Sequence, residues 1–246
     1  MLWIIGGTIN AREIAALLVQ KGMDVLLTTT TPLGSELAQM PGLEVCCGAL
    51  DSEAMVSLIR EKKISTILDA SHPFATEVST NAMQVAIETG TRYLRFERKS
   101  EEYDGVQYFQ SYEEMLQYLQ IKEGNVLLTI GSKHVGVFSS LGNERLFARV
   151  LPVASSIEQC QAAGISAKHI IGIGGVCSEE LNLAIMREYS IRYLVTKDSG
   201  DEGGIPEKLA AARSLDVEVL MLQRPKLDYP EMVSSYEEVI DRIVIK

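Results

Sequence analysis

The sequence predicts an α/β protein with two parallel-sheet domains and a cleft between them. Short apolar runs recur along the chain and alternate with amphipathic stretches of helical periodicity. Such runs fit strands that are buried on both faces of a parallel sheet. Several runs end in clusters of Gly, Ser, Thr or Lys, and open α/β sheets bind their ligands beyond such strand ends. The 246 residues are enough for two domains of ordinary size.

The domain boundary is expected between residues 97 and 124, where the chain becomes charged and rich in tyrosine before the strand pattern restarts. Residues 1–110 are predicted to form an N-terminal, dinucleotide-binding, Rossmann-like domain. Residues 111–246 are predicted to form a second α/β domain that contributes to the substrate cleft, because a cleft between two domains is a common ligand site.

The first strand, residues 2–5, runs into Gly6, Gly7 and Thr8, and a helical pattern follows from about Asn10. Glycines let a phosphate approach the backbone, and the start of a helix presents free N–H groups to it. Ala11 stands at the packing position where the full dinucleotide fingerprint has a third glycine. The turn is therefore either a phosphate cradle or a plain tight turn between a strand and a helix.

The second strand ends in Thr28, Thr29, Thr30 and Thr31. An acidic residue at this strand end favours NAD, whereas small or basic residues admit the extra phosphate of NADP. The hydroxyl groups therefore favour NADPH, with NADH as the other candidate. Alternatively, the threonines are present only for their strand propensity.

The most distinctive stretch joins a strand at residues 64–68 to a helix that ends at Gly90. Asp69, Ser71 and His72 are crowded at this junction, and Pro73 is suited to the first helical position. The alternative is that Asp69 and Ser71 only cap the helix while His72 lies exposed. Imidazole titrates near neutral pH, so His72 is either a general acid or a residue that holds the cofactor.

Basic residues form local clusters although the net charge is −10. One cluster lies around a strand at residues 93–97, in which Arg95 and Glu97 share a face, and consists of Arg92, Arg95, Arg98 and Lys99. Two later strands, residues 126–130 and 193–196, run into Ser132-Lys133-His134 and into Lys197 respectively. Arginine is well shaped to bind anions, so the cluster at residues 92–99 is a candidate anion site. Solvated strand ends are the alternative.

Further helices are expected near residues 52–62, 112–120, 179–189, 206–215 and 232–243, and residues 217–222 are expected to be the last strand. The acidic charge argues against non-specific nucleic-acid binding. No apolar run approaches the length of about 20 residues that a membrane span needs. The N-terminus lacks a signal-peptide pattern, so we expect a cytoplasmic protein with no membrane partner. The four cysteines have no spacing typical of a metal site or a disulfide framework.

Several motifs together resemble the precorrin-6A reductase family, which includes the cobalt-precorrin-6A reductases. The motifs are Gly6-Gly7-Thr8 with Ala11-Arg12, the run from Asp69 to Ala75 followed by Ser79 and Asn81-Ala82, the stretch 94–98, the stretch 129–133, and the strand end 195–200 with Gly203-Gly204. The resemblance covers the whole chain. It departs at Asn10, where the family usually has an acidic residue, and at Gly175-Val176-Cys177-Ser178, where the family usually has Gly-Pro-Phe-Ser.

The resemblance implies an oxidoreductase that uses NAD(P)H to reduce a ring double bond of precorrin-6A or cobalt-precorrin-6A to the 6B form, in cobalamin biosynthesis. The tetrapyrrole substrate carries many carboxylates, which gives the basic clusters a purpose. We expect cofactor-binding residues at Gly6, Gly7, Thr8, Arg12, Thr28, Thr29, Thr30, Ser71, His72, Pro73 and Phe74. We expect substrate-binding residues at Arg95, Arg98, Ser132, Lys133, Lys197, Ser199 and Gly200, a catalytic candidate at His72, and no metal.

Two other functions remain open from the residues alone. A dinucleotide-binding regulator would also need the glycine turn, but it would bind the cofactor without turnover. A methyltransferase-like α/β enzyme that uses S-adenosylmethionine would have a similar turn, but it normally places an acidic residue after the second strand, where this chain has threonines.

Overall fold

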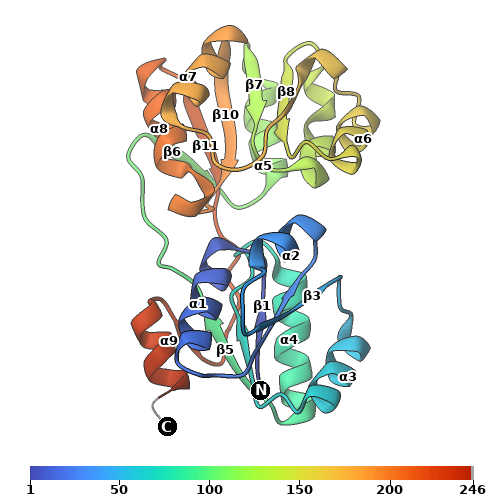
Figure 1. Cartoon of the computed structure of the whole chain (residues 1–246). Coiled ribbons are helices and arrows are strands. Elements are labelled where there is room, and N and C mark those ends of the chain that lie inside the picture. The colour runs from blue at the N-terminus through green and yellow to red at the C-terminus, as the bar shows by residue number, and fades with distance from the viewer. Residues whose placement is uncertain (245–246) are drawn as a thin grey trace. The chain divides into compact units, whose positions relative to one another are not determined.

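The computed structural model describes residues 1–244, which fold into two compact units (Figure 1). The first unit contains Met1–Lys99 and the chain from Pro225 onwards, and the second contains Ser100–Arg224. This differs from the predicted division into residues 1–110 and 111–246, because the C-terminal segment returns to the first unit. No helix within residues 1–244 is long and apolar enough to cross a membrane.

The first unit is built on a six-stranded parallel sheet in the order β12-β5-β4-β1-β2-β3. Its strands are β1 (Leu2–Ile5), β2 (Val25–Thr29), β3 (Leu43–Cys47), β4 (Thr66–Asp69), β5 (Arg92–Phe96) and β12 (Met232–Val233). Its helices are α1 (Ile9–Gln20), α2 (Pro32–Ala38), α3 (Ser52–Lys62), α4 (Thr76–Thr89) and α9 (Tyr236–Ile243).

Both faces of this sheet are covered, as the continuous apolar runs predict. Leu2 and Ile4 of β1 pack into one core with α1 and α9, and Trp3 and Ile5 pack into another with α3 and α4. All four strand residues are 5% exposed or less. The alternation of side chains along β1 therefore supplies two cores from a single strand.

The second unit has a six-stranded parallel sheet in the order β6-β11-β10-β7-β8-β9. Its strands are β6 (Val106–Phe109), β7 (Asn125–Leu128), β8 (Leu146–Val150), β9 (Ile170–Gly172), β10 (Ile191–Lys197) and β11 (Glu218–Leu222). Its α-helices are α5 (Tyr112–Gln120), α6 (Ala154–Ala162), α7 (Glu179–Glu188) and α8 (Ile205–Ser214), and its 3₁₀ segments are η1 (Ser132–Leu141), η2 (Ala167–His169) and η3 (Asp201–Gly203). The prediction of an α/β fold with two parallel sheets is confirmed.

The sixth strand of the first sheet comes from the end of the chain. In the common doubly wound order 3-2-1-4-5-6, the strand beside β5 is the next strand in sequence. Here β12 pairs with β5, and β6 instead pairs with β11 in the second sheet. Helix α9, in red, lies beside α1, in blue, where Tyr236 donates to Asn10 Oδ1 at 2.7 Å (Figure 1).

The predicted final helix at residues 232–243 was too long, and residues 217–222 are not the last strand. Residues 232–233 form β12, and α9 begins only at Tyr236. A capping box explains this start, because the Ser235 side chain accepts from the Glu238 backbone and the Glu238 side chain bonds back to the Ser235 N–H.

Candidate active site

The turn after β1 is locked against the turn after β4. Gly6 has φ 131°, and a Cβ there would lie 2.7 Å from Ala70 O and 2.9 Å from the Ser71 Cα. Thr8 Oγ1 donates to Ala70 O at 2.9 Å and also accepts from the Ala11 N–H, which makes Thr8 the N-cap of α1. Gly6 is therefore required by the close approach of the two backbones. The two turns lie side by side at the carboxyl edge of the first sheet.

Gly7, in contrast, is exposed and has room for a side chain. A Cβ at Gly7 would meet its first neighbour, Thr29, at an ordinary 3.7 Å. The free surface at Gly7 and at the start of α1 is where an anionic group can approach the helix N–H groups.

The threonines after β2 divide into buried and exposed residues. Thr28 Oγ1 accepts from Trp3 Nε1 at 2.9 Å, and Thr29 Oγ1 lies 2.7 Å from Ser35 Oγ. Thr28 and Thr29 are 6% and 2% exposed, so their hydroxyl groups serve the fold. Of the three predicted cofactor contacts in this run, Thr30 is the exposed one.

Arg12 on α1 supplies a positive charge near the same strand end. Its Nη1 donates to Leu37 O of α2 at 3.4 Å, so its side chain reaches the helix that follows β2. Its Nε is buried and has no hydrogen-bond partner in the described residues 1–244. An unpartnered buried donor costs free energy, and a phosphate oxygen would satisfy it. The residues around this turn therefore fit a phosphate-bearing cofactor.

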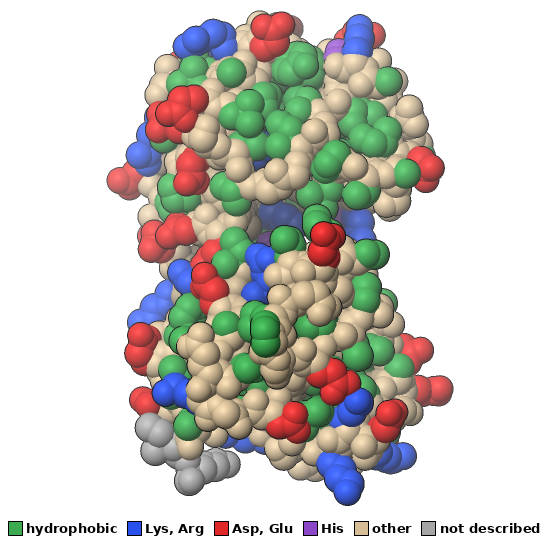
Figure 2. Space-filling view, in the orientation of Figure 1, with side chains coloured by type: hydrophobic (Ala, Val, Ile, Leu, Met, Phe, Trp, Pro, Cys, Tyr) green, Lys and Arg blue, Asp and Glu red, His purple; other side chains and the backbone are tan. Residues whose placement is uncertain are grey.

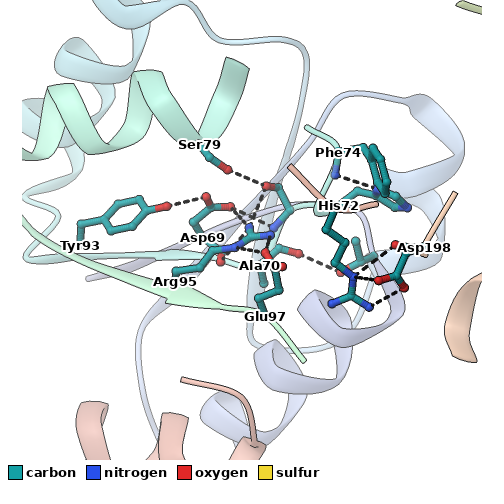
Figure 3. A network of polar contacts seen from close by, with 12 residues as sticks. Asp69, Ala70, His72, Phe74, Ser79, Tyr93, Arg95, Glu97 and Asp198 are labelled. Atoms are coloured by element: carbon teal, nitrogen blue, oxygen red, sulfur yellow. Dashed lines mark hydrogen bonds and ion pairs between the residues drawn. The ribbon is translucent and has the colours of Figure 1, made fainter. Parts of the chain in front are cut away.

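Asp69 at the end of β4 is the centre of a buried polar network (Figure 3). Its Oδ1 accepts from Arg95 Nη1 at 2.9 Å and from the Ser71 N–H at 3.0 Å, and its Oδ2 accepts from the Tyr93 hydroxyl at 2.7 Å. Asp69 and Arg95 are both 0% exposed. The carboxylate thus ties the backbone of the β4 turn to two residues of the neighbouring strand β5.

Arg95 completes the network on its other side. Its Nη2 and Nε donate to Glu97 Oε2 at 2.7 and 3.1 Å, and its Nη1 also donates to Ser71 Oγ at 3.1 Å. Ser71 Oγ lies 3.3 Å from Ser79 Oγ of α4. The guanidinium packs 5.2 Å from the centre of the Tyr229 ring. The network therefore joins β4, β5, α4 and the C-terminal segment.

The charges of this network are mutually stabilised. Burial acts to raise the pKa of Asp69, but the charge of Arg95 and bonds from the neighbouring hydroxyl groups hold that pKa below its usual value. Burial likewise acts to lower the pKa of Arg95, and the carboxylates of Asp69 and Glu97 raise it. Burial and the charge of Asp69 raise the pKa of Tyr93. Asp69 is therefore ionised and Tyr93 is a neutral hydrogen-bond donor.

This geometry disagrees with the expectation that Arg95 binds a substrate carboxylate. The guanidinium is fully buried, and its three nitrogens already donate to Asp69, Ser71 and Glu97. Arg98 is exposed, but its Nη2 donates to the Tyr236 hydroxyl at 3.1 Å on the side where α9 packs. Arg95 is thus a residue that holds the β4 turn in place.

His72 lies in a turn and not at the start of a helix. Helix α4 begins at Thr76 with Ala75 at its N-cap, so the prediction that Pro73 is the first helical residue is wrong. The Phe74 N–H donates to His72 Nδ1 at 3.2 Å, and the Ala75 N–H donates to His72 O at 2.8 Å. Because Nδ1 accepts a hydrogen bond, the ring proton of neutral His72 resides on Nε2.

In the second unit, the predicted residues Ser132, Lys133 and Lys197 lie after β7 and at the end of β10, together with His134. Lys133 and His134 lie in η1, and Lys197 ends β10, which pairs with β7. Burial and the charge of Lys133 lower the pKa of Lys197, and burial and the charges of Lys197 and Lys133 lower the pKa of His134. Ser132 is close by, with its Oγ 3.4 Å from Ser156 Oγ. These residues form one positive region.

Ser199 and Gly200 lie in the tight turn that follows this region. A Cβ at Gly203 would collide with Ser199 Oγ, and one at Gly200 would lie 3.3 Å from Arg224 Nη2. Arg224 pairs with the buried Asp198 through Nε at 3.0 Å. Sequence reasoning missed the Asp198–Arg224 pair, although each residue lies two positions after the end of a predicted strand.

Over the face seen in Figure 2, acidic side chains are interspersed with basic ones in each unit. The described residues contain no cluster of three or more metal-ligating side chains. Three groups of polar residues contain most of the predicted site residues: the glycine turn with Arg12, the Asp69 network with His72, and the positive region at Lys197.

A parallel sheet whose first strand ends in a glycine turn, closed against the turn after β4, is typical of α/β proteins that bind dinucleotides. Residues 1–244 match the sequence model of an enzyme family described as precorrin-6x reductase CbiJ/CobK. The chain belongs to this family.

Full-length relatives agree with this assignment. A cobalt-precorrin-6A reductase of Priestia megaterium is 37% identical over 99% of this chain and 98% of its own length. One of Methanothermobacter thermautotrophicus is 40% identical over 98% of this chain and 82% of its own. The solved structure of CobK precorrin-6A reductase covers 99% of this chain and 96% of its own with a TM-score of 0.81; at 22% identity it supports the fold. The reductase interpretation is thereby confirmed over the regulator and methyltransferase alternatives.

Proposed function

We propose that this reductase of cobalamin biosynthesis uses NADPH to reduce one ring double bond of cobalt-precorrin-6A or precorrin-6A, giving the 6B form. The match of the family over residues 1–244 carries the proposal. The relatives of 37% and 40% identity are both cobalt-precorrin-6A reductases, which favours the cobalt-containing substrate.

The first unit is the proposed cofactor site. The turn Gly6-Gly7-Thr8 and the first N–H groups of α1 would hold the pyrophosphate. Arg12, whose Nε lacks a partner in residues 1–244, would bind the additional phosphate of NADPH together with the hydroxyl of Thr30. Reduced nicotinamide supplies a hydride, and the protein's part is to orient the two ligands.

We assign His72 a hydrogen-bond donor role through Nε2. Nδ1 accepts from the Phe74 N–H, so Nε2 is the donor of the ring in this geometry. His72 would therefore hold the cofactor or the substrate, and water would provide the proton that accompanies the hydride.

The Asp69–Arg95 network has a positioning role in this proposal. It fixes the Ser71 N–H and hydroxyl, and thereby the start of the turn that carries His72. In the second unit, Lys133 and Lys197 are the proposed partners of substrate carboxylates, because like charges held together favour the binding of an anion. Ser132, Ser199 and Gly200 would shape the same edge.

An anaerobic assay tests the function. The protein is incubated with cobalt-precorrin-6A or with precorrin-6A, and the absorbance of NADPH or NADH is followed together with the tetrapyrrole spectrum. We expect NADPH oxidation in proportion to the tetrapyrrole reduced, at a higher kcat/KM than with NADH. Cofactor binding without oxidation in the presence of both tetrapyrroles would overturn the proposal.

A further inference from the structure

A row of polar residues crosses the second sheet at its carboxyl edge. Leu128 of β7 is in register with Ala148 of β8 and with Val195 of β10. The residues that follow, namely Thr129 directly after β7, Arg149 of β8 and Thr196 of β10, therefore form one row on one face. This is the face that α7 and α8 cover, because Leu127, Phe147 and Leu194, two positions earlier, belong to the core that those helices share.

The two covering helices add polar groups to the same place. Ile205 and Leu209 of α8 pack into this core, and Lys208 lies between them on the buried stripe at 7% exposure. Asn182 occupies the corresponding stripe of α7 and is 1% exposed. Apolar residues usually occupy such buried positions, so packing alone does not explain a lysine and an asparagine at 208 and 182.

The hydrogen bonds of these groups leave the positive charges without an anion. Arg149 Nη1 donates to Asn182 Oδ1 at 2.6 Å, and Lys208 Nζ donates to Gly203 O at 2.6 Å. Both acceptors are neutral, and within residues 1–244 neither cation forms an ion pair. The hydroxyl of Thr196 is buried without a partner in the same part of the chain.

The charges of this cluster oppose one another. Burial, followed by the charge of Arg149, lowers the pKa of Lys208 to about 7, and the charge of Lys197 adds to this effect. Burial also lowers the pKa of Arg149. The negative charge of Glu207 raises the pKa of Lys208 only slightly, and its Oε2 has no hydrogen-bond partner in the described chain. Burying unpaired cations is costly, and an incoming anion would remove that cost.

The start of α8 adds the N–H groups of Ile205 and Glu207 next to the cluster, because Pro206 has none, and the Glu207 carboxylate belongs to the same first turn. Its N-cap is Gly204 in the left-handed region, and no side chain caps the helix. A helix N-terminus of this kind attracts negative charge. The loop at residues 172–178 approaches Gly204, since a Cβ there would lie 2.6 Å from Val176 Cγ1, and Gly174, Gly175 and Val176 of that loop are exposed.

We propose that Arg149, Lys208 and the N-terminus of α8 form a binding site for one anionic group, a carboxylate or a phosphate, of a ligand of this reductase. The proposal rests on the proposed function for the ligand's identity. The site adjoins Lys197, which is assigned above to the substrate. Asn182 acts in it by orienting the Arg149 guanidinium.

The first experiment compares Lys208→Met with a matched control, Lys168→Met. Methionine keeps most of the volume of the side chain and removes its charge. Lys168 belongs to the same unit, its side chain is 66% exposed, and its Nζ lies 3.7 Å from Glu144. The dissociation constants of cobalt-precorrin-6A and of NADPH are measured separately under anaerobic conditions at pH 6.5.

We expect Lys208→Met to raise the dissociation constant of one of the two ligands by about tenfold to a hundredfold. This is the effect of losing a charge-assisted hydrogen bond in a buried site. If only the affinity for the tetrapyrrole falls, the anionic group in the site is a carboxylate of the substrate. If only the affinity for NADPH falls, the group is a phosphate of the cofactor. Lys168→Met should leave both unchanged. If Lys208→Met changes neither affinity, or weakens both while lowering the Tm, the proposal is overturned.

The second experiment does not depend on the reductase activity. Citrate and inorganic phosphate are used as probes, and the Tm is measured at pH 6 and at pH 8.5. The groups that face Lys208 are Arg149 from β8, Lys197 from β10, Cys177 from the loop before α7, and Glu207 from α8 itself. We expect one or both anions to raise the Tm, more at pH 6, where Lys208 is charged.

This increase should be lost in Lys208→Met and retained in Lys168→Met. Because Lys208→Met also removes the bond to Gly203 O, Arg149→Met serves as a second variant and should lose the increase as well. An equal increase in all four proteins would contradict the site. A wild-type protein that fails to oxidise NADPH but shows this pattern would overturn the proposed function and leave the anion site standing.

Discussion

The carboxylate of Asp69 and the guanidinium of Arg95 form a fully buried ion pair, with Oδ1 and Nη1 2.9 Å apart. The two residues are directly paired in the register of β4 and β5. The pair fixes the backbone at Ser71, and so connects the interior of the sheet to the turn that carries His72.

Replacing one partner of this pair should destabilise the first unit strongly. Asp69→Asn leaves the Arg95 charge buried with only Glu97 to compensate it, and breaking a buried pair in this way costs about 3–5 kcal/mol. The free energy of unfolding in urea measures the loss. The matched control is Glu44→Gln, which breaks the half-exposed pair with Lys62 and should cost about 1 kcal/mol or less. Equal losses in the two variants would contradict a dominant role for the buried pair.

The contribution of Asp69 should depend on pH in a defined direction. Its pKa is lowered in the folded protein, so the unfolded chain takes up the proton first as the pH falls. The stability that Asp69 contributes is therefore complete well above its ordinary pKa of 3.8 and is lost at lower pH. The difference in unfolding free energy between the wild type and Asp69→Asn should be constant from pH 6 to 8 and should shrink below about pH 4. A difference that grows on acidification would show that Asp69 is not held ionised.

Two neighbouring glycines should respond to substitution in opposite ways. Gly6→Ala places a Cβ 2.7 Å from Ala70 O at φ 131°, so it should lower the Tm or prevent folding. Gly7→Val, where the first contact lies at 3.7 Å, should fold and should weaken NADPH binding by about tenfold or more, because the side chain occupies the approach of the pyrophosphate. Thermal unfolding and a fluorescence titration with NADPH separate the two effects. A folded Gly7→Val protein with unchanged affinity would remove this turn from the cofactor site.

The role of His72 can be tested with a variant that keeps a donor. His72→Gln retains an N–H group but has no imidazole to titrate. We expect turnover within about tenfold of the wild type at saturating ligands and a raised KM for NADPH or the tetrapyrrole, whereas loss of a general acid would reduce kcat by about 100-fold or more. Steady-state kinetics across the pH range distinguish these outcomes. A large fall in kcat with an altered pH profile would restore the general-acid hypothesis.

Arg12 should determine the preference between the two nicotinamide cofactors. Arg12→Met removes the charge proposed to bind the additional phosphate, so kcat/KM for NADPH should fall by about tenfold or more while that for NADH changes little. NADH serves as the internal control in the same assay. Equal losses with the two cofactors would assign Arg12 to the contact between α1 and α2 instead.

The sequence predicted much of the fold because the strands are continuous apolar runs and the strand ends are polar. The helix at residues 52–62 was predicted with the observed bounds, since its amphipathic stripe lies between Asp51, which caps it, and Lys63, which ends it in the left-handed region. Pro73 was misplaced because a proline suits a tight turn as well as a first helical position. The burial of Arg95 was missed because an alternating strand pattern cannot show which polar residue has an ion-pair partner on the next strand.

The pairing of β12 with β5 was also beyond local reasoning. A strand of two residues has no period of its own, and its place in the sheet depends on a partner more than a hundred residues earlier in the sequence.

The same pairing sets an order of events during synthesis. By the time Lys99 has been made, the first sheet still lacks β12 and the helix that packs on α1, and the entire second unit must be translated before they arrive. Domains generally fold as units while the chain emerges, with the N-terminal domain first. Here the first unit begins to fold first but can complete its sheet only after the second unit has been translated. Until then the outer edge of β5 has unpaired backbone groups to which another strand can bind. A nascent chain that stalls within the second unit would expose this edge to chaperones and to neighbouring chains.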